Sequence, residues 1–398
     1  MRHFDYLNAK NEDSIFFQKP ARFSKDSEKE LLAQGMGATL YMPGTRPNIS
    51  GEITAKKYDG LVSMALCLED AIGDHEVEDA EMNIITHLQQ LYMNIEKGLF
   101  KYEDLPLIFI RVRNEEQMRN VAGHLGSSIK VLSGFIFPKF NPENGHGYIQ
   151  ALLDINEAYG MQLYGMPILE SEDIIYKETR VSSLMKIKEL LDQNYGRILN
   201  VRMGATDFCG LYGIRRGSDT TIYDISVVRD CIADIVNVFA RSEKEYVISG
   251  PVWEYFHTLE RVMKPQLRQT PFRNSRGTEG LLIRENILNN YLDGLIKEVL
   301  LDKTNGLTGK TIIHPTHILP VHSFSVVSFE EYLDAMSIME SAAGDAGVKK
   351  SQFSNKMNEM KPHFNWANKI MTKARAYGVY HEQSSYIDLL AKQESIHI

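Results

Sequence analysis

Eight short apolar segments recur along this chain, and each one ends abruptly in polar or glycine residues. Runs of this length, rich in Val, Ile, Leu and Phe, are typical of strands that are buried on both faces. We therefore predict strands over Ala38–Met42, Ser63–Leu68, Leu107–Val112, Gly134–Phe137, Leu163–Leu169, Ile198–Met203, Tyr246–Ser249 and Lys310–Ile313.

The stretches between these segments carry apolar residues at helical spacing, for example Val228, Cys231, Ile232, Ile235, Val236 and Phe239. Strands that alternate with amphipathic helices predict repeated βα units and a parallel sheet. Eight such units fit a closed (β/α)8 TIM barrel, an α/β fold. A doubly wound open sheet is the alternative, but no glycine-rich dinucleotide fingerprint follows the first strand.

Three regions are predicted along the chain. Residues 1–36 form an N-terminal extension, residues 37–325 a TIM-barrel catalytic domain, and residues 326–398 an appended C-terminal helical region. Within the barrel, residues 241–284 are long for one connection and rich in Pro and Gly, which predicts a loop insertion. We expect the C-terminal region to pack on the barrel or on a neighbouring subunit.

Composition excludes several classes of partner. The net charge is −8 without a long Lys/Arg block, which argues against a nucleic-acid partner. No apolar run approaches the roughly 20 residues that span a bilayer, and residues 1–30 lack the apolar core of a signal peptide. Cys67, Cys209 and Cys231 form neither a disulfide framework nor a metal-binding spacing. We expect a cytoplasmic protein with no membrane partner.

In a barrel of this kind, polar residues at the carboxyl ends of the strands are the site candidates. They are Met42-Pro43-Gly44, Glu69-Asp70, Arg111-Val112-Arg113-Asn114, Pro138-Lys139, Glu170-Ser171, Gly204-Ala205-Thr206-Asp207, Gly250-Pro251 and His314-Pro315. Carboxylates, cations and glycine turns would therefore meet at one mouth of the barrel.

Glu170 and Asp207 are the predicted metal ligands. Two carboxylates from neighbouring strand ends, without Cys or clustered His, favour a hard ion such as Mg²⁺, and Mn²⁺ also prefers oxygen ligands. The alternative is that both residues are helix caps or first-turn acids, which the helix dipole favours.

Arg111 ends an otherwise apolar strand, where it could grip a carboxylate or stabilise a developing oxyanion. An ion pair with Glu69 or Asp70 is the alternative role, and the two roles are compatible. Lys139 would be a cation for the substrate or a solvated lysine. Gly204, Ala205 and Thr206 are small enough for a ligand carboxylate to reach backbone N–H groups. His314 has no visible partner, so we expect a structural role for it.

Taken in order, these motifs resemble the citrate lyase β-subunit-like branch of the HpcH/HpaI aldolase family. The resemblance spans residues 37–335, and its motifs are Leu40–Gly44, Leu68–Ile72, Ile110–Asn114, Pro138-Lys139, Ile168–Ser171, Gly204–Phe208 and Gly309–Pro315. It implies a metal-dependent carbon–carbon bond lyase of the phosphoenolpyruvate/pyruvate type. Relatives are commonly homotrimers or hexamers, so we expect a homo-oligomer.

The resemblance also implies roles for the individual residues. Glu170 and Asp207 would bind Mg²⁺, and Arg111 would face the carbonyl or enolate oxygen of a small carboxylate substrate. Glu69 and Asp70 would hold water on the metal or orient Arg111. The substrate would be bound by the remaining strand-end residues, Pro43, Gly44, Lys139, Gly204, Ala205 and Thr206.

Departures from the family pattern point to a divergent branch, such as the proteins associated with tellurite-resistance gene clusters. An acidic segment, Asp74–Glu81, stands where relatives carry Lys and Arg, and the residues 241–284 and 357–378 are atypical. The resemblance by itself allows a CoA-linked substrate, but these departures argue against citryl-CoA or malyl-CoA. They point to a phosphorylated or nucleotide-linked metabolite, with Arg215, Arg216 and the Ser275–Thr278 turn as candidate phosphate contacts.

Two other functions stay open at the level of sequence. One is a non-catalytic barrel that binds a metabolite or acts as a scaffold, and the other is a thioester hydrolase that uses the same metal. Charged groups that converge at one mouth favour catalysis over a scaffold, because buried charge is costly without a function. The hydrolase and the lyase both begin with a polarised carbonyl.

Overall fold

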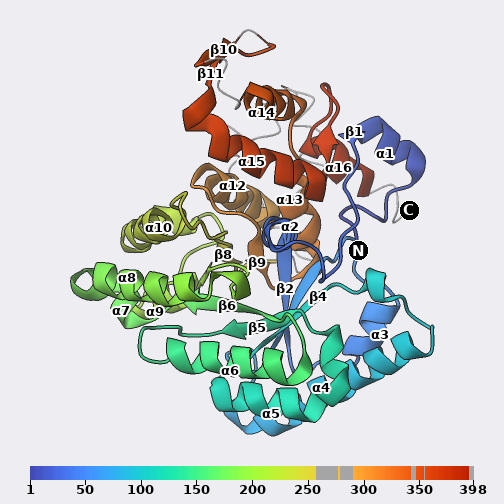
Figure 1. Cartoon of the computed structure of the whole chain (residues 1–398), viewed down its shortest axis with the longest axis vertical. Coiled ribbons are helices and arrows are strands. Elements are labelled where there is room, and N and C mark those ends of the chain that lie inside the picture. The colour runs from blue at the N-terminus through green and yellow to red at the C-terminus, as the bar shows by residue number, and fades with distance from the viewer. Residues whose placement is uncertain (257–276, 278–289, 342–346, 354, 394–398) are drawn as a thin grey trace.

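Eight parallel strands form the centre of the molecule in a computed structural model that describes residues 1–256, 277, 290–341, 347–353 and 355–393 (Figure 1). The strands are β2 Ala38–Pro43, β3 Ser63–Cys67, β4 Leu107–Arg111, β5 Gly134–Phe137, β6 Tyr164–Leu169, β7 Arg202–Met203, β8 Gly250–Trp253 and β9 Lys310–Ile312. Their order in the sheet is β7-β6-β5-β4-β3-β2-β9-β8. The predicted TIM barrel is confirmed, and the open doubly wound alternative is wrong.

The barrel closes through residues just before β7 and β8. The backbone N–H of Val201 donates to the Val247 carbonyl at 2.9 Å, and the N–H of Ser249 donates to the Val201 carbonyl at 3.0 Å. These two bonds join the ends of the sheet, so the eight strands make a nearly closed ring.

Helices surround the strands: α3 Ile49–Thr54, α4 Val77–Glu96, α5 Glu115–Leu125, α6 Gly145–Tyr159, α7 Glu172–Ile175, α8 Lys177–Gln193, α9 Ala205–Leu211, α10 Ser226–Phe239, α12 Asn290–Thr304 and α13 Ile318–Ser323. Local sequence explains their limits. Asn114 caps α5 by accepting a hydrogen bond from the Gln117 N–H at 2.9 Å, and Gly160 ends α6 with a left-handed backbone. The helical spacing predicted between Val228 and Phe239 is confirmed, because α10 covers this stretch and buries most of its apolar residues.

One predicted strand is displaced. The strand expected over Tyr246–Ser249 is wrong, because β8 begins at Gly250, and only an isolated bridge from Ile248 to Val201 precedes it. Pro251 has no N–H to donate and argued for a loop, yet the pairing of β8 with β9 is irregular between Gly250 and Trp253 and accommodates it. Part of the predicted 241–284 loop is therefore strand, and most of the rest lies outside the described residues.

The two ends of the chain pack together on one side of the barrel (Figure 1). The N-terminal elements are α1 Ala9–Ile15, β1 Phe16–Gln18 and α2 Lys29–Gly35, and the C-terminal elements are α14 Phe329–Ser341, β10 Val348–Lys350, β11 Met357–Glu359, α15 Met360–Tyr377, β12 Val379–Tyr380 and α16 Tyr386–Gln393. β1 pairs with β12 in antiparallel fashion, and α15 packs against α14 and α2.

This terminal layer covers the amino ends of the barrel strands. The Tyr377 hydroxyl donates to the Gln34 carbonyl at 2.9 Å within this layer. The His3 ring of the layer lies 4.4 Å from the ring of His322 on α13, whose Nε2 accepts from the Ala38 N–H at 3.0 Å at the start of β2. The C-terminal helices thus lie on their own barrel, at the end opposite the carboxyl ends of the strands. Within the described part of the chain, none of the helices combines the length and apolarity that crossing a membrane requires.

Candidate active site

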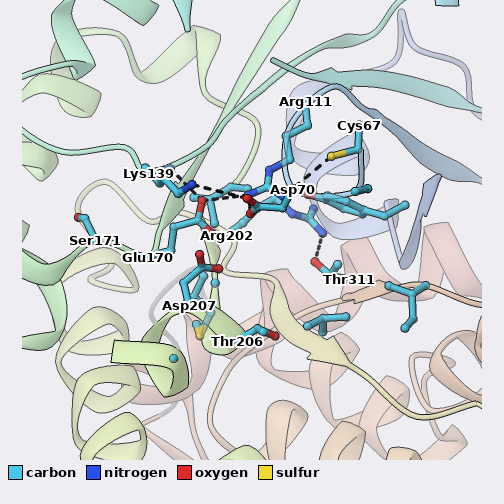
Figure 2. A pocket seen from close by; sticks show the side chains of 18 of the residues that line it. Cys67, Asp70, Arg111, Lys139, Glu170, Ser171, Arg202, Thr206, Asp207 and Thr311 are labelled. Carbon is cyan, nitrogen blue, oxygen red and sulfur yellow. Dashed lines mark hydrogen bonds and ion pairs between the residues drawn. The ribbon is translucent and has the colours of Figure 1, made fainter. Parts of the chain in front are cut away.

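A cavity of about 830 Å³ opens at the carboxyl ends of the barrel strands. Most of the predicted charged residues line it, and Figure 2 shows how their side chains turn toward one another. The lining includes Asp70, Arg111, Lys139, Glu170, Gly204, Thr206 and Asp207. Strand ends that are far apart in sequence therefore converge as the fold class predicts.

Arg111 is the centre of the charged cluster. It ends β4 and is buried, and its Nη2 lies 2.6 Å from Glu69 Oε2, 3.0 Å from Asp70 Oδ2 and 3.2 Å from Glu170 Oε1. Burial alone lowers the pKa of a guanidinium, but the carboxylates of Glu170 and Glu69 outweigh it and raise the pKa of Arg111. The predicted ion pair with Glu69 and Asp70 is present, and Arg111 also faces the cavity.

Lys139 binds two of these carboxylates. Its backbone N–H donates to Glu170 Oε1 at 2.8 Å, and its Nζ donates to Glu69 Oε1 at 2.6 Å. Its φ of +49° is unusual for a residue with a side chain and stores about 1–3 kcal/mol of backbone strain. Asn144 steadies this turn by donating from Nδ2 to the Lys139 carbonyl at 2.9 Å. These hydrogen bonds therefore hold Lys139 in a fixed position in the site.

Glu170 and Asp207 approach each other across Gly204. A Cβ on Gly204 would lie 2.1 Å from Glu170 Oε2 and 3.0 Å from Asp207 Oδ2. Burial raises the pKa of Glu170 to about 8 against the opposing effect of Arg111, and burial together with the nearby Asp70 carboxylate raises the pKa of Asp207. Two close carboxylates with raised pKa values form a site that a cation would stabilise.

Helix capping does not explain Glu170. The N-cap of α7 is Ser171, while the Glu170 carboxylate accepts bonds from Arg111 and Lys139. Asp207 does lie in the first turn of α9, as the alternative expected, but its side chain also lines the cavity. The two roles coincide at Asp207.

The donor set fits a hard divalent ion. Mg²⁺ takes one or two protein carboxylates and completes its octahedron with oxygens of water and substrate. In the part of the chain that the structure describes, no group of three His, Cys, Asp or Glu side chains could hold a metal by itself. Glu170 and Asp207 could therefore hold Mg²⁺ in a shell that stays open to substrate.

The other predicted site residues, Glu69, Ala205, Pro43 and Gly44, are not part of the cavity lining. Glu69 is buried behind Arg111, and Ala205 is buried at the start of α9. Pro43 and Gly44 do not line the cavity, because the chain after β2 turns toward α4, where a Cβ on Gly44 would meet Ile84 and Ala80. A substrate-binding role for Pro43 and Gly44 thus has no support from their placement.

Of the candidate phosphate contacts, Arg216 is a structural residue. It is buried, pairs with Glu298, and donates to the Val252 carbonyl. The hypothesis that it binds phosphate is wrong, because its donors are already occupied by protein oxygens. Arg215 is exposed, and Ser275, Arg276 and Thr278 lie outside the described residues.

His314 lies beside the mouth without entering the cavity lining. Its Nδ1 is 2.8 Å from Thr316 Oγ1, and its ring stacks on Phe256 with centroids 4.9 Å apart. These contacts agree with the structural role expected for it.

Sequence reasoning missed two polar residues near the cavity. Glu254 follows β8 and accepts a hydrogen bond from the Thr206 hydroxyl at 2.6 Å, and the displaced strand hid it. Arg202 lies inside β7 and lines the cavity. A charged residue within the apolar run Ile198–Met203 was the signal that could have identified it.

Comparisons with known proteins agree with this geometry. A family model described as C–C bond lyase of the TIM-barrel fold matches residues 30–379. Among solved structures, the CitE protein of Mycobacterium tuberculosis in complex with magnesium, acetoacetate and coenzyme A is 15% identical with a TM-score of 0.50, and the match covers 86% of this chain and 99% of that one.

A citrate lyase of Burkholderia xenovorans LB400 is 13% identical with a TM-score of 0.55, covering 86% of this chain and 93% of that one. No curated protein sequence matches the chain. At these identities the solved structures show a shared fold, while the family model covers most of the chain, including every barrel strand. The chain therefore belongs to the family of C–C bond lyases of the TIM-barrel fold.

Proposed function

We propose that this protein is a Mg²⁺-dependent carbon–carbon bond lyase or aldolase that acts on a carboxylate or keto-acid substrate through an enolate. The observation that carries the proposal is the approach of Glu170 and Asp207 across Gly204, beside Arg111. Family membership supports the reaction class.

The charge balance of the cluster supports a divalent ion. Glu69, Asp70, Glu170 and Asp207 supply four carboxylates, whereas the neighbouring cations are Arg111 and Lys139. With all four carboxylates ionised, two negative charges remain, and burial raises the pKa of Glu170 because that charge is poorly compensated. Bound Mg²⁺, or Mn²⁺ in its stead, would offset both charges and polarise a substrate carbonyl as a Lewis acid.

Arg111 would stabilise the enolate oxygen. Its Nη2 is held by carboxylates, but its Nε is buried without a hydrogen-bond partner, and its Nη1 has only a weak contact with Cys67 Sγ at 4.0 Å. A preorganised guanidinium beside a developing negative charge lowers the barrier more than it would in water. Glu69 and Lys139 fix the position of this cluster.

The substrate carboxylate would lie at the start of α9. Ala205 and Thr206 are its first residues, and backbone N–H groups in the first turn of a helix are free of intrahelical partners. Thr206 adds a hydroxyl that lies on the cavity and is held by Glu254. This seat would place the 2-oxo group of a keto acid next to Glu170 and Asp207.

A direct test is cleavage of 4-hydroxy-2-oxo acids, whose retro-aldol reaction releases pyruvate. Pyruvate release would be followed with Mg²⁺, with a chelator, and in a Glu170→Gln variant. Metal-dependent release lost in the variant supports the lyase. Hydrolysis of acyl-thioesters without any cleavage of 4-hydroxy-2-oxo acids would favour the hydrolase, and inactivity toward both would favour a binding or scaffold role. Trimeric or hexameric assembly and a cytoplasmic location stay predictions.

A further inference from the structure

Arg202 is a fully buried cation on the floor of the same cavity. It lies on β7, is 1% exposed, and donates from Nη2 to Thr311 Oγ1 at 2.7 Å (Figure 2). Its Nη1 is 3.5 Å from Thr39 Oγ1, and its guanidinium carbon is 5.6 Å from the centre of the Tyr41 ring. Arg202, Tyr41 and Thr311 all belong to the cavity lining.

The charge of Arg202 has no carboxylate partner among the described residues. Arg111 in the same cavity pairs with three carboxylates, and the buried Arg216 pairs with Glu298 and Glu254. The protein partners of Arg202 are neutral hydroxyls, and its Nε is buried without any partner. A buried charge without a counter-ion is strongly unfavourable, so this arrangement suits a site that an anionic ligand completes.

The short separation between Arg202 and Gly204 limits the length of that ligand. Gly204 stands two positions after Arg202, just beyond the end of β7, so the backbones of the two residues are at most about 7 Å apart. Gly204 marks the place where Glu170 and Asp207 meet. A molecule held at those carboxylates could reach the guanidinium with a chain of only a few carbon atoms.

We propose that Arg202, with Tyr41 and Thr311, forms a second anion subsite that takes the distal carboxylate of a short dicarboxylic 2-oxo acid. The proposal rests on the proposed function, because the Mg²⁺ site would hold the other end of that substrate. One guanidinium matches one singly charged, planar carboxylate in charge and in geometry. A phosphate, with its higher charge, would call for a second cation without a carboxylate partner, whereas Arg111 and Lys139, the other cations of the described cavity lining, are already paired with carboxylates.

Tyr41 adds a neutral donor to the subsite. Burial raises the pKa of its phenol, although Arg202 and Arg111 oppose that effect, so the hydroxyl stays protonated at neutral pH. The hydroxyl of Thr311 orients the guanidinium by accepting its Nη2 bond. Arg202 on β7 thus supplies the positive charge of the subsite. Thr311 on β9 orients the guanidinium, and Tyr41 on β2 supplies a neutral hydrogen-bond donor.

The test compares matched ligands that differ only at the distal end. Dissociation constants in the presence of Mg²⁺ would be measured by calorimetry for 2-oxobutanoate against oxaloacetate, and for 2-oxopentanoate against 2-oxoglutarate. We expect the better-fitting dicarboxylate to bind at least about tenfold more tightly than its matched monocarboxylate, as a charge-assisted hydrogen bond would give. In Arg202→Met that preference should vanish, while affinity for the monocarboxylates changes less than about twofold.

Two further variants keep the test decisive. Arg119→Met removes an exposed arginine that pairs with Asp154 far from the lining, changes the net charge equally, and should keep the preference. Thr311→Val retains Arg202 but removes its orienting hydroxyl, and should weaken the preference partly even where Arg202→Met unfolds. Circular dichroism and thermal melting would verify folding.

The outcomes separate this inference from the function on which it rests. Mg²⁺-dependent binding of monocarboxylates without any dicarboxylate preference would overturn the subsite and leave the proposed function standing. A preference that survives Arg202→Met, or a phosphorylated 2-oxo acid that binds more tightly than both dicarboxylates through Arg202, would also overturn it. Absence of Mg²⁺-dependent binding by every 2-oxo acid would refute both.

Discussion

Gly204 and Glu170 lie so close together that a Cβ on Gly204 would be 2.1 Å from Glu170 Oε2. The backbone of Gly204, with φ −97° and ψ 81°, does not require glycine for its conformation. Space alone requires it, since the missing side chain is what lets the Glu170 carboxylate lie against the start of α9. The glycine of this strand-end motif is thus part of the geometry of the predicted metal site.

Gly204→Ala should therefore reduce Mg²⁺-dependent activity by about a hundredfold or more, because the new methyl group displaces a carboxylate that must be fixed closely. Mg²⁺ titration by calorimetry and the rate of pyruvate release would measure the effect. Gly123→Ala, in α5 and outside the cavity lining, is the matched control, since a Cβ there has no atom within 4 Å. Equal loss in both variants would contradict the role assigned to Gly204.

Mg²⁺ should stabilise the folded protein. A ligand that binds only the native state at about 100 times its dissociation constant adds about 3 kcal/mol to the free energy of unfolding. Thermal melting with and without Mg²⁺ would show this in the wild type, and Glu170→Gln or Asp207→Asn should remove most of the shift. An unchanged shift in both variants would place the ion elsewhere.

Lys310 belongs to the Gly-Lys motif but serves stability. Its Nζ is buried and lies 2.9 Å from Glu298 Oε1 and 2.7 Å from Asp302 Oδ2. Lys310→Met leaves those carboxylates buried without their cation and should lower the free energy of unfolding by about 3–5 kcal/mol. Denaturant unfolding measures this loss. Lys297→Met, at a partly exposed pair with Asp224, should cost less than about 1 kcal/mol.

Acid should weaken the contact between the terminal layer and the barrel. His3 and His322 are fully buried, and burial lowers the pKa of His3 to about 3 and the pKa of His322 well below its ordinary value. Below about pH 6.5 the unfolded chain takes up protons that the native protein excludes. The stabilisation present above pH 6.5 is therefore lost progressively as the pH falls toward 3.

The slope of unfolding free energy against pH between 6.5 and 4 measures this effect. His322→Gln keeps an acceptor for the Ala38 N–H and removes one titrating group, so it should reduce the slope by about one proton. His146→Gln, at an exposed histidine of α6, is the control and should leave the slope unchanged. Identical slopes in all three proteins would contradict the prediction.

Much of the barrel could be predicted because a doubly buried parallel strand has a clear local signature. Runs such as Leu107–Ile110 are apolar throughout, and the fold class then brings their carboxyl ends together without further information. The clustering of Arg111, Lys139, Glu170 and Asp207 follows from that topology. Their roles in binding and catalysis stay predictions.

Long-range packing set the limits of prediction. Residues 1–30 read as polar and charged, yet Phe4 and Phe16 are buried, because their rings meet those of His322 and Tyr380, more than 300 positions away in the sequence. Pro251 signalled a loop although its strand tolerates it at an irregular position. Arg202 lies within the strand predicted over Ile198–Met203, and only the three-dimensional cavity shows it facing the site.

The central claim is a metal-dependent site that stabilises an enolate, and proton NMR of pyruvate in D₂O tests it most directly. With the protein and Mg²⁺, the account predicts exchange of the methyl protons for deuterium, lost with a chelator and in Glu170→Gln, and kept in Gly123→Ala. Exchange at the same rate in Glu170→Gln, or no exchange although pyruvate binds with Mg²⁺, would contradict it.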